Sequence, residues 1–181
     1  KPASMMAAVA GLALAGVGFA LSGLERFYQA YLVAYTFWLG VALGSMALLM
    51  VQHLTGGAWG VVIRRPLEAA ASTIPAMALL FLPIIPGMHD LYHWTHADAM
   101  ADPLIAAKAP YLNTPFFLVR AAGYFLLWIG MSQLLLKWSR EQDQTGDPAL
   151  SRKLSFLSGG GLLVYALTVN FAITDWLMSV N

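Results

Sequence analysis

The stretch that decides the fold runs from Tyr28 to Pro86, and its centre, residues 53–70, reads HLTGGAWGVVIRRPLEAA. This pattern predicts a long apolar helix ending at His53, a glycine-rich turn, and a second apolar helix just after the pair Arg64 and Arg65. Charged groups beside the end of an apolar helix cost free energy in hydrocarbon, so they need partners or a task. We therefore expect the function of the chain to involve this block.

The composition of the 181-residue chain is that of a membrane protein. It is 59% hydrophobic and 10% charged, with a mean hydropathy of +0.67, whereas soluble domains carry about 25% charged residues. The sequence contains no cysteine. This excludes thiolate-bound iron–sulfur clusters, cysteine zinc sites and c-type haem attachment within this chain.

Five apolar segments have the length of about 20 residues that a membrane-spanning helix needs. They lie near Ser4–Ser22, Tyr28–Leu54, Pro66–Ile85, Pro115–Trp138 and Leu157–Met178. We predict an all-α integral membrane protein, a single domain over residues 1–181 built as a bundle of about five transmembrane helices. Because the chain starts at a lysine and stops after an apolar run, we expect it to be part of a longer subunit.

The charges between the spans predict an orientation. If the N-terminus lies inside, seven lysine and arginine residues face the cytoplasm and two face outward, which is a firm positive-inside bias. The inner set is Lys1, Arg64, Arg65, Lys137, Arg140, Arg152 and Lys153, and the outer set is Arg26 and Lys108. The segment 86–114, which is rich in histidine and aspartate, is therefore expected outside.

Glu68, in the predicted third span, allows two interpretations. Pro66 at the first helical position and an acid in the first turn are typical of a well-capped helix, with Arg64 and Arg65 as headgroup anchors. Alternatively, Glu68 meets His53 across the glycine-rich turn and forms a titratable pair that passes protons.

Arg120 lies about two turns inside the fourth span and needs an anion or a water-filled cavity. Topology places Asp175 at a similar depth in the fifth span, so we predict an ion pair between them. This pair either fixes helix register or forms, with the His53 and Glu68 group on the other side, one of two half-paths for protons.

The segment with His89, His93 and His96 carries ligand types that suit zinc or copper. However, it begins at Pro86-Gly87, where no regular helix is assured. A solvated outer loop without a metal is the favoured interpretation.

Five blocks of the sequence resemble one family when taken together. They are FWLG at 37–40, HLTGGAWGVVIRRPLEA at 53–69, KAPYLN with PFF at 108–117, WSREQD at 138–143, and TDWLMS at 174–179. They look like ActF, a membrane component of bacterial alternative complex III that is similar to the NrfD and PsrC membrane proteins. The resemblance covers the chain from its second predicted span to its end.

The resemblance implies that this chain is about the N-terminal half of a ten-helix subunit in the bacterial inner membrane. It implies membership of a quinol:electron-acceptor oxidoreductase whose iron–sulfur clusters and haem c are held by partner subunits, with no cofactor in this chain. The implied partners are other membrane and periplasmic subunits, the lipid bilayer, and menaquinol or ubiquinol, with no nucleic acid. The polar in-membrane positions that carry over are His53, Arg64, Arg65, Glu68, Arg120 and Asp175.

Three functions remain open from the sequence. In the family, ActC is usually assigned the quinol site, and ActF is a proton-conducting or structural candidate. We therefore expect this chain to support proton translocation coupled to electron transfer in its neighbours. The alternatives are a direct quinol site at His53 and Glu68 and a purely structural anchor.

Overall fold

The computed structural model describes residues 6, 9–11, 13–14, 16–19, 23–57, 59–96 and 98–180. Among these residues all regular secondary structure is helical, and four helical segments are long and apolar enough to cross a membrane. The predicted all-α, multi-pass membrane fold is thus confirmed. Of the predicted span Ser4–Ser22, residues 6, 9–11, 13–14 and 16–19 are described and are helical, and the other positions lie outside the described residues.

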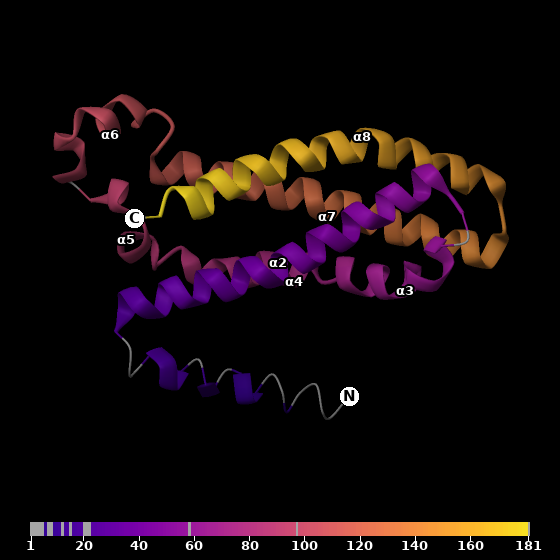
Figure 1. Ribbon diagram of the computed structural model, residues 1–181, viewed down its shortest axis with the longest axis horizontal. Coiled ribbons are helices and arrows are strands. Elements are labelled where there is room, and N and C mark those ends of the chain that lie inside the picture. The colour runs from indigo at the N-terminus through magenta and orange to yellow at the C-terminus, as the bar shows by residue number, and fades with distance from the viewer. Residues whose placement is uncertain are drawn as a thin grey trace.

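The four spans run up and down as two hairpins (Figure 1). They are built from α2 (Leu24–Thr55); α3 (Trp59–Ala71), α4 (Ile74–Phe81) and the 3-10 turn η1 (Leu82–Ile84); α7 (Thr114–Thr145); and α8 (Pro148–Ile173) with the π-helical turn η4 (Thr174–Met178). Helix α2 packs against α3, α4 and α8, while α7 packs against α8 and α4. The hairpins share one core rather than forming separate units.

Helices α7 and α8 extend beyond the spans predicted at Pro115–Trp138 and Leu157–Met178. Capping residues decide their ends: the Asn113 side chain accepts from the Phe116 amide, and the Asp147 side chain accepts from the Ala149 amide. Between the helices, Gly146 takes a left-handed conformation at φ 65°, which favours glycine. The lengths of the apolar runs therefore predicted where the chain spans the membrane, while short polar side chains determine where the helices begin and end.

The third span does not begin at Pro66, as the sequence suggested. Helix α3 begins at Trp59 and contains Pro66 in its interior, and a turn at Ser72 and Thr73 separates it from α4. The prediction of a well-capped start is wrong, because Glu68 lies beyond the first turn of α3. A proline inside a helix removes one backbone hydrogen bond, which costs less near the membrane surface, where water is at hand.

An aromatic core fills the half of the bundle near the N-terminus of α7. The Trp176 ring lies 4.9 Å from the Phe81 ring and 5.6 Å from the Phe125 ring, centroid to centroid. Trp128 is fully buried beside them. These large rings join α4, α7 and η4 through dispersion and apolar burial.

The segment between α4 and α7 folds as a cap over this end of the bundle. It contains α5 (Met88–Leu91), the 3-10 turns η2 (His93–Thr95) and η3 (Asp98–Ala101), and α6 (Pro103–Lys108). Its Leu91, Tyr92 and Trp94 side chains are buried, and the Tyr92 and Trp94 rings contact Phe117 of α7. The expectation of a merely solvated loop is therefore wrong for its first half, because three large apolar side chains gain more by packing on the core.

Candidate functional site

Polar side chains gather at both ends of the bundle. We call the end that holds the turns after α2 and α7 the basic end, and the end covered by the cap the histidine end. They lie at the right and the left of Figure 1 respectively.

At the basic end, the Glu68 carboxylate is the centre of an ion cluster. It is 7% exposed. Its Oε1 accepts from Arg64 Nε at 3.0 Å and its Oε2 from Arg65 Nη1 at 2.6 Å. These residues are three and four positions apart on α3, the spacing that puts side chains on one helix face.

Helix α7 completes this cluster with two residues that were not predicted. The Ser139 hydroxyl donates to Glu68 Oε1, and Arg65 Nη2 pairs with Asp143. Arg64 also donates to the Ser139 carbonyl at 3.3 Å. Ser139 and Asp143 lie four positions apart within the block WSREQD, and that helical spacing was the available signal. We refer to Arg64, Arg65, Glu68, Ser139 and Asp143 as the basic-end cluster.

His53 lies at the C-terminal end of α2 but does not form the predicted pair with Glu68. No hydrogen bond or ion pair joins the two side chains in the described part of the chain. The two arginines take the carboxylate instead, because charge-assisted bonds from guanidinium groups are strong and directional. Beside them is a small cavity of about 170 Å³ lined by Gln52, Arg64, Arg65 and Asp143, and the buried Gln52 Oε1 has no hydrogen-bond partner among the described residues.

At the histidine end, Asp175 and Arg120 form the ion pair that topology predicted. The carboxylate is 2% exposed and receives a bidentate contact from the guanidinium, at 2.8 Å from Nε and 3.0 Å from Nη2. The Tyr111 and Tyr124 hydroxyls donate to it at 2.9 and 3.2 Å. We refer to these four residues as the histidine-end cluster.

The remaining face of the Arg120 guanidinium is also covered. It donates to the Tyr111 carbonyl at 3.0 Å and lies 3.9 Å and 4.4 Å from the centroids of the Tyr111 and Phe116 rings. Cation–π contact and hydrogen bonding thus replace the water that the charge gives up. The arginine is fully accommodated inside the protein.

Two tyrosines of the cap hold the π-helical turn that carries Asp175. The Tyr92 hydroxyl donates to the Trp176 carbonyl at 3.1 Å, and Tyr111 donates to Asp175 itself. Burial raises the pKa of Tyr92, with Asp175 adding to the effect. Burial and the hydrogen bond to Asp175 raise the pKa of Tyr111. Both phenols therefore keep their protons and act as donors at neutral pH.

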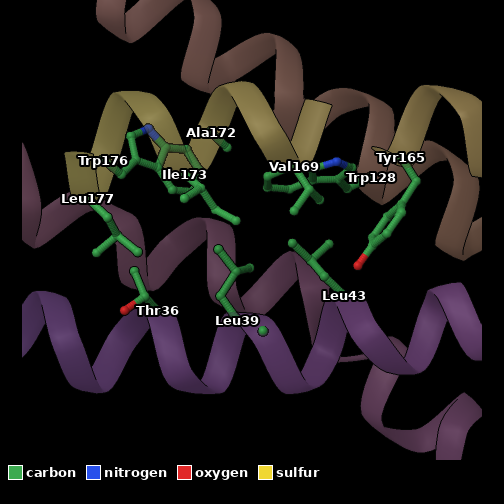
Figure 2. A pocket seen from close by; sticks show the side chains of 11 residues that line it. Thr36, Leu39, Leu43, Trp128, Tyr165, Val169, Ala172, Ile173, Trp176 and Leu177 are labelled. Carbon is green, nitrogen blue, oxygen red and sulfur yellow. The ribbon is translucent and has the colours of Figure 1, made fainter. Parts of the chain in front are cut away.

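The region between the two clusters is mainly apolar, although the buried hydroxyls of Ser132 and Ser158 lie within it. A crevice of about 170 Å³ lies between α2 and α8, and Figure 2 shows Leu39, Leu43 and Val169 among the side chains that line it. The Tyr165 hydroxyl points into it from α8. None of the six predicted site residues lines this crevice. From Arg120 to Ser139, the rise of 1.5 Å per residue along α7 gives a separation of about 28 Å, close to the hydrocarbon thickness of a bilayer.

The three histidines of the cap lie near one another but do not converge as ligands. The His89 and His96 ring centroids are 4.0 Å apart, and His96 Nε2 lies 2.7 Å from the His89 carbonyl oxygen. Across the described residues, no three histidine or acidic side chains are arranged to hold a metal ion.

Comparison of the chain with protein-family models gave no match, and comparison with curated proteins gave none either. A functional conclusion therefore rests on the two clusters and on the sequence blocks that carry them. Four of those blocks contain cluster residues: 53–69, 108–117, 138–143 and 174–179.

Proposed function

We propose that this chain is a membrane subunit of a quinol-oxidising respiratory complex resembling alternative complex III, and that it supports proton translocation. One observation carries the proposal: two buried carboxylates, Glu68 and Asp175, lie at opposite ends of a single membrane-spanning bundle. Each is surrounded by guanidinium and hydroxyl groups. Ionisable residues inside membrane proteins commonly mark proton or ion paths.

In this function each cluster is the terminus of a half-path. Ser139 at the basic end and Tyr124 at the histidine end have hydroxyls hydrogen-bonded to a carboxylate, and such hydroxyls both donate and accept hydrogen bonds, as a proton relay requires. The mainly apolar region between the clusters requires ordered water or a movement of helices for a proton to cross. Electron transfer in neighbouring subunits can control proton passage at this point, by changing the ordered water or the positions of the helices.

The proposed setting is the bacterial inner membrane, with the basic end in the cytoplasm. The described cations support this orientation, because Arg64, Arg65 and the exposed cations of α7 and α8 gather at the basic end. Iron–sulfur clusters and haem c belong to partner subunits in this proposal. The absence of cysteine from the sequence agrees with that division.

A purely structural anchor is the second candidate, and the geometry of Asp175 favours it. Its two oxygens accept four hydrogen bonds, which leaves the carboxylate saturated. The alternative quinol site at His53 and Glu68 gains no support, because the Glu68 oxygens face two arginines and a serine. The cavity beside them is lined by Gln52, Arg64, Arg65 and Asp143, so neither His53 nor Glu68 borders it.

Replacing Glu68 by glutamine in the reconstituted complex tests the proposal. Glutamine keeps the size of the side chain but cannot carry a proton as a carboxylate does. We expect the number of protons translocated per electron to fall by about half or more, with quinol oxidation retained. Proton release into the vesicle lumen, measured with a pH dye during quinol turnover, gives the ratio.

Glu141→Gln is the matched control, since Glu141 is an exposed acid on α7 at the same end. It should leave the ratio unchanged. If Glu68→Gln assembles normally and retains both the proton ratio and quinol turnover, proton relay through Glu68 is wrong and the anchor role remains.

A further inference from the structure

A hollow of about 350 Å³ opens at the histidine end beside Asp175. It lies between the end of α6 with the residues that follow it and the turn η4. Its walls carry Lys108, Tyr111 and Leu112 on one side and Thr174, Met178 and Ser179 on the other. The proton-path proposal does not use this space.

Each hydroxyl group in the hollow already donates its hydrogen to another acceptor within the protein. Tyr111 donates to the Asp175 carboxylate, Thr174 donates to the Asn170 carbonyl at 3.0 Å, and Ser179 donates to the Asp175 carbonyl. Each hydroxyl oxygen still has a lone pair. The hollow therefore offers hydrogen-bond acceptors, which suit a ligand that has hydrogen-bond donors.

One cation lines the same hollow. Lys108 is exposed, and within the described residues its ammonium makes no ion pair. Asp175 does not neutralise it, because that carboxylate is already paired with Arg120. The hollow thus presents an unpaired positive charge near a set of acceptors, which suits a ligand that carries both an anion and a donor.

The depth of the hollow identifies the kind of molecule that reaches it. It lies at the ends of α7 and α8, beyond the Arg120 and Asp175 pair, at the level where a bilayer has its headgroups. Met178 is 74% exposed, and with Leu112 it gives the hollow an apolar side. A ligand here meets polar groups and hydrocarbon together.

We propose that this hollow binds the headgroup of a phospholipid that carries a phosphodiester and a primary ammonium, as phosphatidylethanolamine does. The phosphate pairs with Lys108, and the ammonium donates to the oxygens of Thr174 and Ser179. The first acyl carbons lie against Leu112 and Met178. The lipid then closes the outer face of the histidine-end cluster.

The test is a titration of the delipidated full-length protein, isolated with the partners that copurify, followed by native mass spectrometry. The probes are phosphatidylethanolamine, phosphatidylcholine and inorganic phosphate. We expect one tight phosphatidylethanolamine site, weakened about tenfold by Lys108→Ala, the order expected for one charge-assisted hydrogen bond. Arg26→Ala is the matched control, because Arg26 is an exposed cation at the same end and does not line the hollow.

Two results would overturn the proposal. Equal weakening by Lys108→Ala and Arg26→Ala, or none by either, would show that the hollow is not the site. Competition by millimolar inorganic phosphate would show that it takes a free anion rather than a lipid. Phosphatidylcholine has no N–H donor, so its binding as tightly as phosphatidylethanolamine would contradict the ammonium contacts to Thr174 and Ser179.

Discussion

At the scale of single residues, the Asp175 carboxylate shows how the protein carries charge into an apolar bundle. Burying an ion costs several kcal/mol unless its hydrogen-bonding capacity is met. Arg120, Tyr111 and Tyr124 meet it from two directions. Removing one partner leaves the other charge buried and unpaired, which is far more costly than removing an exposed pair.

A double-mutant cycle on Arg120 and Asp175 measures this coupling. We expect each single alanine variant to lose about 3–5 kcal/mol of stability, and the double variant to lose clearly less than the sum. Denaturant unfolding in detergent, followed by circular dichroism, gives the three values. Strictly additive losses would show that the two side chains do not interact.

Tyr111→Phe provides a milder comparison within the same cluster. It removes one hydroxyl donor from Asp175 and leaves the ring against the Arg120 guanidinium. Its loss should be about 1 kcal/mol, the usual net contribution of one hydrogen bond. Comparing this loss of stability with the losses of the alanine variants separates the contribution of the ion pair from that of the surrounding hydrogen-bond donors.

At the scale of elements, α8 approaches α2 closely at one glycine. A Cβ atom at Gly161 would lie 2.9 Å from the sulfur of Met50 and 3.4 Å from that of Met131. The first distance is shorter than real Cβ atoms show, and the second is at the lower edge of ordinary van der Waals contact. The lack of a side chain at Gly161 therefore lets α8 pack against α2 and α7 together.

Gly161→Leu should push α8 away from α2 and cost about 1–3 kcal/mol, the range for overpacked cores. The control is Gly160→Leu, since Gly160 is exposed and a Cβ there would meet no atom within 4 Å. Thermal unfolding of the two variants in the same detergent compares them. Because leucine has the higher helix propensity, an equal loss in both would mean that contact with lipid or detergent, rather than packing against α2, sets the effect.

The observed helices show which features of the fold can be predicted from sequence patterns. Apolar runs located all four described spans, because a bilayer demands a length of apolar helix. They did not locate the start of α3, since Trp59–Arg65 is helical without being uniformly apolar. They also missed the packed part of the cap, because Leu91, Tyr92 and Trp94 are separated by polar residues and find their partners only in three dimensions.

The candidate site likewise contains contacts that the sequence predicts and contacts that depend on how the helices pack. Arg120 and Asp175 were paired correctly from depth alone, because each stood out as a charge inside an apolar run. For Glu68, one of the two interpretations chose His53 as its partner because the two residues are close in sequence, whereas its hydrogen bonds go to Arg64, Arg65 and Ser139. Its contacts with Ser139 depend on how α7 packs beside α3, which one sequence does not reveal.

At the scale of the whole molecule, the absence of native cysteine makes the orientation easy to measure. We expect Ala107→Cys, exposed in the cap, to react with a membrane-impermeant maleimide in spheroplasts. Gln144→Cys, exposed at the basic end, should react only after the membrane is opened. The reverse pattern would place the basic end outside and contradict the positive-inside assignment.

The two clusters hold helix α7 at opposite ends of the bundle. The basic-end cluster joins α7 to α3 of the other hairpin, and the histidine-end cluster joins α7 to the turn η4 of its own hairpin. Helix α7 takes part in both clusters. A change at one end therefore has a direct covalent route to the other, through a single continuous helix.

The spacing of the two clusters along α7 has a consequence for the choice of membrane. Because their separation of about 28 Å matches ordinary hydrocarbon thickness, the bundle has a preferred lipid length. A thicker bilayer would draw one set of charges into hydrocarbon, and a thinner one would expose apolar helix to water. Hydrophobic mismatch of either sign costs a fraction of a kcal/mol per ångström. The acyl-chain length of the host membrane thus acts on both ends of the protein at once.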